Sequence, residues 1–401
     1  MAALNLPEPN AFDAAIAPMD REEFITRHWG ETFLRVPGDP HRFEGLMSWD
    51  DLNRLLQLHP LHALKLKLSL DDEPLDLGKY TFRQGSANAP TLSPATLSNC
   101  LAAGATMILD HVDEVAPGPR RIAIDFERAL KTHTSINLYA SWRAQPGFDL
   151  HWDGQDAFIF QLEGRKRWSV FEPTLPHPLK RLGDQPRPPG AEPVWEGLLE
   201  RGDLLYLPRG WWHRVCPVGE PSLHLTVSLE PVHGGDLLDW FVEQLCRRPE
   251  VRKRIPRLAN PDEISVYMQT LRATMLDEWT GDLATRYLED LDGNSIIRPE
   301  FDLPRSVAPR NAALGPDSRL RPVSPRGLSI SPAGEPHLVE VRSLGRRLQA
   351  PRDIAPALAL LNGACVRPVR ELCDQLPPEV ATGRLMVVLA QLVLAGMVVL
   401  E

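Results

Sequence analysis

The 401-residue sequence is poor in lysine and cysteine and has no long uninterrupted apolar run. Only 7 of its 44 basic residues are lysines, so a lysine at a structurally special position requires an explanation. The five cysteines are odd in number and form no C-x-x-C pair, which argues against a disulfide framework or a cysteine zinc site and favours a reducing cytoplasm. The most apolar stretch, residues 385–400, is interrupted by Gln391 and Gly396 and is too short for a comfortable membrane span.

Positive charge is also in deficit, since the formal net charge is −9. This balance argues against a generally basic nucleic-acid binder. The first residues contain no basic segment followed by an apolar run, so we expect no secretory signal. The shares of hydrophobic (43%) and charged (24%) residues are those of a globular chain, which at this length has room for two or three domains.

The segment from Thr106 to Leu229 contains many short strand-like runs between glycine and proline turns. Short strands at this spacing predict an antiparallel sandwich or barrel. Within the segment, Glu163 and Gly164 separate the strand-like runs 157–162 and 166–171. A short glycine-containing spacer of this type predicts a β-hairpin.

The character of the sequence changes after this segment. We expect a mainly β domain over residues 1–233, followed by a helical module over 234–290 whose first helix is capped by Asp236. Residues 291–334 are rich in proline, arginine and serine without clear periodicity, which predicts a linker or irregular structure. Residues 335–401 alternate between strand-like and helical patterns and predict a small α/β module.

An H-x-D pair, His151 and Asp153, stands just before one of the strand-like runs. Residues i and i+2 of an extended chain point to the same face, so this imidazole and this carboxylate can approach one ion. His213 follows a later strand-like run and a Pro-Gly turn, and it can supply a third ligand if the sheet wraps around. Two histidines and one carboxylate form the triad of non-haem Fe(II) oxygenases, which leaves metal positions open.

An isolated H-x-D pair is a weak signal, because the chain contains a second one, His111 and Asp113. The ordinary interpretation of either pair is a surface turn or a capped turn. His224 also competes for the place of the third ligand, although a hydrogen-bonded core histidine is its ordinary interpretation. The order of the elements that follow His151 favours the first pair.

Lys166 stands in one of the strand-like runs of this segment. Alternation places it on the face of Trp168 and opposite Arg165 and Arg167. A lysine that faces the interior of a barrel requires an anionic partner, because burial of an unpaired charge is costly. The alternative is that the two arginines face inward and Lys166 is solvated.

Three motifs in this order, His151-Trp-Asp153, Phe158–Trp168 and Gly202–His213, resemble the Jumonji-C cupin oxygenases, most of all their ribosomal oxygenase branch. The resemblance implies a mainly β double-stranded β-helix (cupin or jelly-roll) barrel, followed by a helical dimerisation module and a C-terminal winged-helix-like α/β module. It also implies an Fe(II)- and 2-oxoglutarate-dependent dioxygenase that hydroxylates a protein side chain, with a ribosomal protein as the substrate.

Residue by residue, the resemblance makes His151, Asp153 and His213 the iron ligands. It puts Lys166 in the place of the basic residue that pairs with the distal carboxylate of 2-oxoglutarate. It assigns no metal role to the position of His111. Three further polar residues match positions that line the co-substrate pocket: Asn137, Tyr139 and Thr226.

Several bulky side chains cluster around the expected ligands in the sequence: Trp142, Arg143, Trp152, Trp211 and Trp212. They form either an aromatic wall that holds a peptide near the iron or part of the barrel core. The proline-rich stretch 173–193 is either a rim loop that shapes substrate access or an ordinary surface connection.

The helical module suggests a homodimer, because residues 236–290 present more than one apolar stripe. Residues 335–401 carry 7 acidic and 7 basic residues, so we expect no direct nucleic-acid binding by this module. Three alternatives to the ribosomal-protein hydroxylase stay open: a peptide natural-product hydroxylase of the same superfamily, a non-catalytic cupin binding protein, and a zinc hydrolase with the same three ligands. The domain order makes histone demethylation less favoured.

Overall fold

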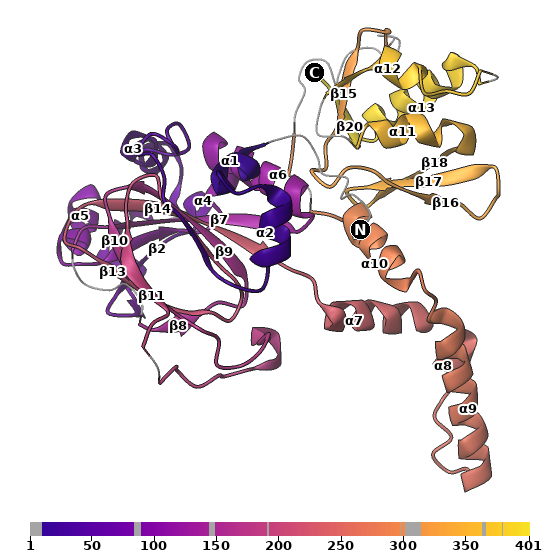
Figure 1. Ribbon diagram of the computed structural model, residues 1–401, viewed down its shortest axis with the longest axis horizontal. Coiled ribbons are helices and arrows are strands. Elements are labelled where there is room, and N and C mark those ends of the chain that lie inside the picture. Colours follow the sequence, from indigo (N-terminus) through magenta and orange to yellow (C-terminus); the bar gives the residue numbers. More distant parts are fainter. Residues whose placement is uncertain are drawn as a thin grey trace. The chain divides into compact units, whose positions relative to one another are not determined.

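The computed structural model describes eight ranges of the chain: residues 10–83, 90–143, 149–190, 192–296, 298–300, 314–362, 366–378 and 380–401 (Figure 1). The chain divides into two compact units, Met1–Pro231 and Val232–Glu401. Each unit is described by itself below. Within the described ranges, no helix combines the length and the apolarity that a membrane span requires.

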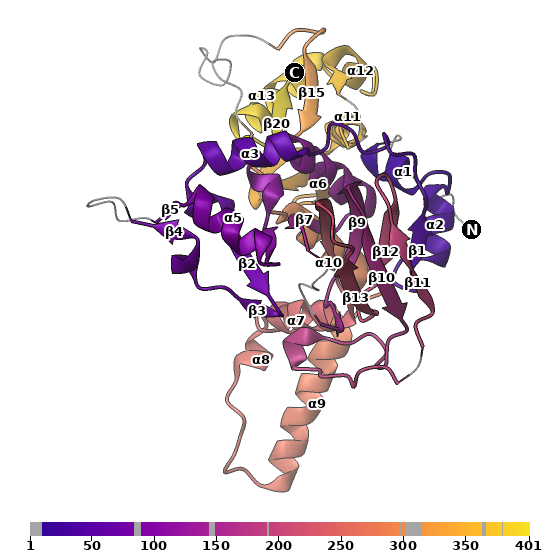
Figure 2. The same ribbon diagram turned by 90° about the vertical axis from the view of Figure 1, so that its left-hand side faces the viewer.

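Two antiparallel sheets build the first unit (Figures 1 and 2). The larger sheet has the order β1 (Leu34–Val36), β12 (Leu204–Leu207), β9 (Asp156–Glu163), β14 (Ser222–Glu230), β7 (His133–Ser141), β6 (Thr106–Leu109), β2 (Leu66–Leu70) and β3 (Glu73–Pro74). The smaller sheet has the order β11 (Trp195–Leu199), β10 (Lys166–Phe171), β13 (Trp212–Pro217) and β8 (His151–Trp152). From β8 to β14 the chain passes repeatedly from one sheet to the other. Of the two predicted architectures, sandwich or barrel, the strands form the first: two open antiparallel sheets whose inner faces pack together.

Alternation along β9 explains how the larger sheet is buried on both faces. Phe158 and Phe160 point toward a layer of helices, whereas Ala157 and Ile159 point toward the smaller sheet. The helices of this layer are α1 (Ala11–Ile16), α2 (Arg21–Arg27), α3 (Trp49–Leu58), α4 (Leu61–Leu64), α5 (Pro94–Ala102) and α6 (Pro117–Leu130). Phe126 of α6 meets Phe158 edge to face, with ring centroids 5.1 Å apart. The inner face of the sheet is thereby left free to form a site.

The turn at Glu163 and Gly164 does not close a hairpin. β9 pairs with β12 and β14, whereas β10 pairs with β11 and β13 of the other sheet. Gly164 has φ +63°, and a Cβ there would lie 2.1 Å from the carbonyl oxygen of Pro221. Only glycine allows the chain to cross between the sheets at this point. The hairpin prediction is wrong because turn residues indicate a reversal of the chain and not which strands pair.

The second unit begins with the helices α7 (Gly234–Leu245), α8 (Pro249–Arg252), α9 (Pro261–Glu278) and α10 (Leu283–Gly293). His233 is the N-cap of α7, and Asp236 occupies the third helical position, where its carboxylate accepts from the backbone N–H of His233. The prediction that Asp236 is the cap is therefore wrong by three residues, although Asp236 completes the capping box. Along the 18 residues of α9, only Thr274 is buried.

The C-terminal part of this unit contains two three-stranded sheets. One has the order β19 (Arg367–Pro368), β15 (Arg319–Pro322), β20 (Val398–Leu400), and the other β16 (Ser329–Pro332), β17 (Leu338–Ser343), β18 (Arg346–Pro351). The helices α11 (Ala355–Leu360), α12 (Val369–Cys373) and α13 (Thr382–Leu394) complete it. The linker predicted over 291–334 is thus wrong for β15, which pairs with β19 and β20 far along the chain, and for β16, which pairs with the next strand, β17; residues 301–313 lie outside the described ranges.

Candidate metal centre

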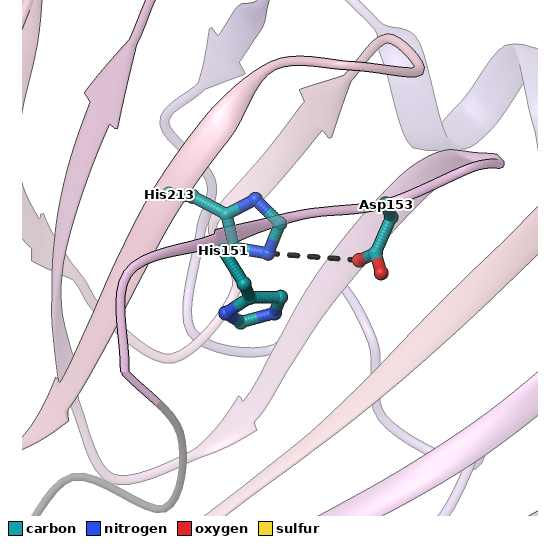
Figure 3. A group of neighbouring side chains, drawn as sticks. All are labelled: His151, Asp153 and His213. Carbon is teal, nitrogen blue, oxygen red and sulfur yellow. Dashed lines mark ion pairs between the residues drawn. The ribbon is translucent and has the colours of Figure 1, made fainter. Parts of the chain in front are cut away.

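Three side chains of the first unit converge on one point (Figure 3). His151 of β8 and His213 of β13 are directly opposite in the antiparallel register, so both imidazoles leave the same face of the smaller sheet. Their ring centroids are 4.3 Å apart. Asp153 follows β8 immediately, and its Oδ2 lies 3.6 Å from Nε2 of His213. One potential ligand atom from each residue lies within 4.8 Å of the other two, which is close enough to bind one ion.

Backbone carbonyl groups set the orientation of both imidazoles. Nδ1 of His151 donates to the carbonyl of Asp149 at 2.7 Å, and Nδ1 of His213 donates to the carbonyl of Trp211 at 3.2 Å. The proton on Nδ1 leaves Nε2 of each ring unprotonated and available for a metal. The structure thus brings together the three predicted ligands in a ligating arrangement.

The electrostatics of the group favour the ligating protonation states. Burial and the neighbouring His151 together lower the pKa of His213 to about 4, so His213 is neutral at physiological pH. Burial alone would raise the pKa of Asp153, but His213, His151 and Lys180 together hold it below its usual value. Asp153 is therefore a carboxylate and His213 a free base.

Lys180 is a neighbour of this group that the sequence did not single out. Its Nζ lies 3.5 Å from Oδ1 of Asp153. It comes from the segment between β10 and β11, far from the three motifs. Lysines are rare in this arginine-rich chain, and this rarity could have drawn attention to Lys180.

A cavity of about 300 Å³ adjoins the triad, and its walls come from both sheets. Lys166 lies on its inner wall with 3% of its surface exposed, and burial lowers the pKa of this lysine to about 7. Arg165 and Arg167 point outward, where they pair with Glu220 and Glu196. The predicted face of Lys166 is thereby confirmed. Among the residues that the structure describes, no hydrogen bond or ion pair involves its ammonium group.

Two of the three further pocket residues line this cavity. Tyr139 of β7 and Thr226 of β14 face it, and His224 lies beside them, stacked on Tyr139 with ring centroids 4.9 Å apart. Asn137 is not among the described lining residues, and its carboxamide oxygen accepts from the backbone N–H of His111 at 3.0 Å. Asn137 thus holds a neighbouring turn, and its side chain also hydrogen-bonds Tyr139 of the cavity wall, so its place at the co-substrate pocket stays a prediction.

The competing histidine motifs have structural roles. His111 adopts a left-handed backbone conformation with φ 54°, and buried Asp113 accepts from the backbone N–H of Ile136 at 2.9 Å. This second H-x-D pair stabilises a turn between β6 and α6. His224 lies in the cavity wall but outside the group that can bind one ion.

The tryptophans near the ligands mostly belong to the core. Trp211 packs in the cluster between the sheets, and Trp142 meets Trp49 with ring centroids 5.3 Å apart. Trp152 and Trp212 are buried together with Phe171. Arg143 donates to the carbonyl oxygen of Ala102. None of the four tryptophans is among the cavity-lining residues that the structure describes, whereas Trp168 is.

An open cupin-type sheet pair with a two-histidine, one-carboxylate group defines a class, and the comparison with known families agrees with it. Residues 115–237 match the family model described as the JmjC domain. This region of the chain is therefore similar to a JmjC domain, and the JmjC cupin fold that the motifs implied is confirmed for it.

The ribosomal oxygenases are the relatives that the chain resembles. It is 31% identical over 224 residues to "Ribosomal oxygenase 1" of Rattus norvegicus, which covers 54% of this chain and 36% of the relative. It is 27% identical over 216 residues to "Bifunctional lysine-specific demethylase and histidyl-hydroxylase NO66" of Drosophila persimilis, covering 53% and 30%. The chain thus spans only about a third of the length of these curated relatives.

Solved structures extend the similarity of fold over nearly the whole chain. The "Crystal structure of Escherichia coli ribosomal oxygenase YcfD" matches with a TM-score of 0.55 at 20% identity, covering 96% of this chain and 98% of that chain. A structure of the same protein "in complex with Cobalt and 2-oxoglutarate" matches with a TM-score of 0.56 at 20% identity, covering 96% and 99%. At this identity the match shows the fold alone.

Proposed function

We propose that the chain is an Fe(II)- and 2-oxoglutarate-dependent dioxygenase that hydroxylates a protein or peptide side chain, with a ribosomal protein as its substrate. One observation carries the proposal. A single cavity contains both the triad and the buried ammonium of Lys166, which lacks an anionic partner among the described residues. The metal–oxoglutarate complex of the E. coli ribosomal oxygenase supports the choice of ligands.

The donor set fits a divalent iron ion. Two imidazole nitrogens and one carboxylate oxygen, from His151, His213 and Asp153, leave about three positions of an octahedral site open. The cavity of about 300 Å³ has room for a small dicarboxylate beside them. The metal and the co-substrate, when bound, supply the oxygen activation, which no protein side chain can perform.

The residues of the chain bind and orient the metal and the co-substrate. Lys166 holds the distal carboxylate through a charge-assisted hydrogen bond in a cavity with little access to water. Burial raises the pKa of Tyr139, so its phenol keeps its proton and serves as a further donor. Thr226 adds a hydroxyl to the same wall. A carboxylate in this place also restores the ordinary charge state of Lys166.

The substrate class follows from the relatives. They are named as a ribosomal oxygenase and as a bifunctional lysine-specific demethylase and histidyl-hydroxylase, and from the first of these names we infer a ribosomal protein as substrate for this chain. We also infer a cytoplasmic location, as the sequence predicts. A peptide natural product is the alternative substrate within the same superfamily.

We further propose that the second unit makes the enzyme a homodimer. Helix α9 exposes large apolar side chains, namely Ile264, Val266, Met268, Met275 and Leu276. Ile264, Met268 and Met275 lie at helical spacing on one face, and a second copy of the helix is a suitable cover for that face. We also propose that residues 335–401 belong to a winged-helix-like module, and the balanced charge of these residues favours a structural or protein-contact role over direct nucleic-acid binding.

Anaerobic reconstitution with Fe(II) and 2-oxoglutarate, followed by air and a host ribosomal-protein mixture, tests the function. We expect oxygen-dependent succinate and one added oxygen on one protein, detected by mass spectrometry. Asp153→Ala and His213→Ala should both abolish this turnover, because each removes a ligand. Wild-type turnover in both variants would refute the assignment. Zinc-dependent hydrolysis without succinate would point to a hydrolase, and metal binding without any turnover to a binding protein.

A further inference from the structure

One more charged side chain reaches the candidate metal centre. Lys180 begins the short helix η3 (Lys180–Leu182) between β10 and β11. Its Nζ lies 3.5 Å from Oδ1 of Asp153, whereas Oδ2 of the same carboxylate faces Nε2 of His213 at 3.6 Å. The two oxygens of Asp153 therefore face different partners, and Oδ2 is the one placed to join the imidazoles in binding a metal.

The position of Lys180 is set by its surroundings. Its Nζ lies 5.0 Å from the ring centroid of Trp152, as in a cation–π contact. Its aliphatic stem crosses Gly154, where a Cβ would lie 3.2 Å from Cδ of the lysine. The backbone N–H of Leu179 donates to Asp184 at 2.7 Å, which fixes the entry into η3. The ammonium is thus directed at the carboxylate before any ligand binds.

The whole segment is attached to the turns that carry the ligands. A Cβ on Gly210 would lie 2.6 Å from Cδ of Pro178, so the two backbones approach as closely as glycine permits. Nε1 of Trp212 donates to the hydroxyl of Thr174 at 3.0 Å. The N–H of Gly210 donates to the carbonyl of Asp153 at 2.9 Å. These contacts therefore connect the segment that carries Lys180 to the turn at Asp153 and to the residues just before His213.

We propose that Lys180 is a positioning residue that holds Oδ1 of Asp153, so that the carboxylate binds a metal through Oδ2 alone. The inference rests on the proposed metal site. A carboxylate that bound through both oxygens would occupy a position that a chelating co-substrate requires. Lys180 is not among the described residues that line the cavity, so it acts through Asp153.

Mutation of a residue that orients a metal ligand without touching the metal typically lowers metal affinity or activity by about 10–100-fold. We expect the lower end, because the Lys180–Asp153 pair is long and its side chains are 54% and 46% exposed. Loss of the ammonium should therefore weaken 2-oxoglutarate binding to the metal-loaded protein by about tenfold. It should not weaken metal binding itself, since a neighbouring positive charge is removed.

Cobalt(II) reports the coordination by its visible absorption, without any turnover. We would load wild type, Lys180→Met, Lys180→Arg and Lys79→Met with Co(II) anaerobically, record the spectra and titrate 2-oxoglutarate. Lys79 is exposed and distant in the sequence from the ligands, so its variant is the matched control. We expect wild type, Lys180→Arg and Lys79→Met to share one Co(II) spectrum and one affinity for 2-oxoglutarate. Lys180→Met alone should show an altered spectrum and weaker 2-oxoglutarate binding.

The outcomes separate the two proposals. If wild type binds Co(II) and 2-oxoglutarate and Lys180→Met matches it in spectrum and affinity, the role of Lys180 is refuted while the proposed function stands. If Lys180→Met has lost Co(II) affinity and Lys180→Arg fails to restore it, the lysine supports the fold of the segment and the positioning role is again refuted. If wild type binds no Co(II), the metal centre is wrong and this inference falls with it.

Discussion

Replacement of Lys166 by methionine tests the central feature of the site, a buried ammonium without an anionic partner among the described residues. The pKa of Lys166 falls from 10.5 to about 7 because of burial. At about 1.36 kcal/mol per pKa unit, folding of the charged form costs roughly 5 kcal/mol relative to the neutral amine. Lys166→Met keeps the length of the side chain and removes that cost. We therefore expect the metal-free variant to be more stable than wild type at pH 7.

The pH dependence has a definite sign. The folded pKa lies below the unfolded one, so between about pH 7 and 10.5 the unfolded state binds more protons, and stability rises with pH. Between pH 7 and pH 9, the titration of Lys166 raises the free energy of unfolding of wild type by about 2 kcal/mol relative to the variant. Other titrating groups cancel in the comparison, because both proteins contain them.

Urea unfolding of both proteins at pH 7, 8 and 9 measures the difference, first without ligand and then with Co(II) and 2-oxoglutarate. Ligand at about 100 times its dissociation constant should stabilise wild type by about 2.7 kcal/mol and the variant by much less. Lys79→Met should behave as wild type throughout. A variant that is less stable than wild type at pH 7, or a difference that stays constant up to pH 9, would refute the reasoning.

Two further predictions concern core packing and assembly. Trp152→Phe should lower the melting temperature but leave the ratio of succinate to hydroxylated product unchanged, because Trp152 is buried with Phe171 and Trp212; a higher ratio at an unchanged melting temperature would instead place Trp152 at the substrate. Wild type should be a dimer in light scattering and Met268→Lys a monomer, since this exposed methionine lies on the same face of α9 as Ile264 and Met275; a monomeric wild type would contradict the proposed dimer.

Local patterns in the sequence were sufficient for several parts of the site. Alternation alone puts Lys166 on the face of Trp168 and opposite Arg165 and Arg167, because side chains on a strand alternate strictly between faces. The H-x-D spacing places His151 and Asp153 on one face for the same reason. These features depend on neighbours in the chain, so no knowledge of the tertiary fold is needed to predict them.

Other features depend on residues that are distant in the chain. The turn at Gly164 has the composition of a hairpin, yet β9 and β10 belong to different sheets. β15 is hidden in a proline- and arginine-rich stretch because its partners, β19 and β20, stand some tens of residues later. Asn137 has the right strand face for the pocket, but its carboxamide is used by the turn at His111.

By itself, the sequence determined the identity of the chemical groups: two imidazoles, a carboxylate and an inward lysine, each at a spacing that a strand converts into a shared face. Only the tertiary structure decided that His151 and His213 stand opposite each other in one register, that Lys166 shares a cavity with them, and that Lys180 approaches Asp153 from a distant segment. The physical reason is that alternation acts within a strand, whereas register, burial and the approach of charges are set by packing between strands that the chain order does not specify.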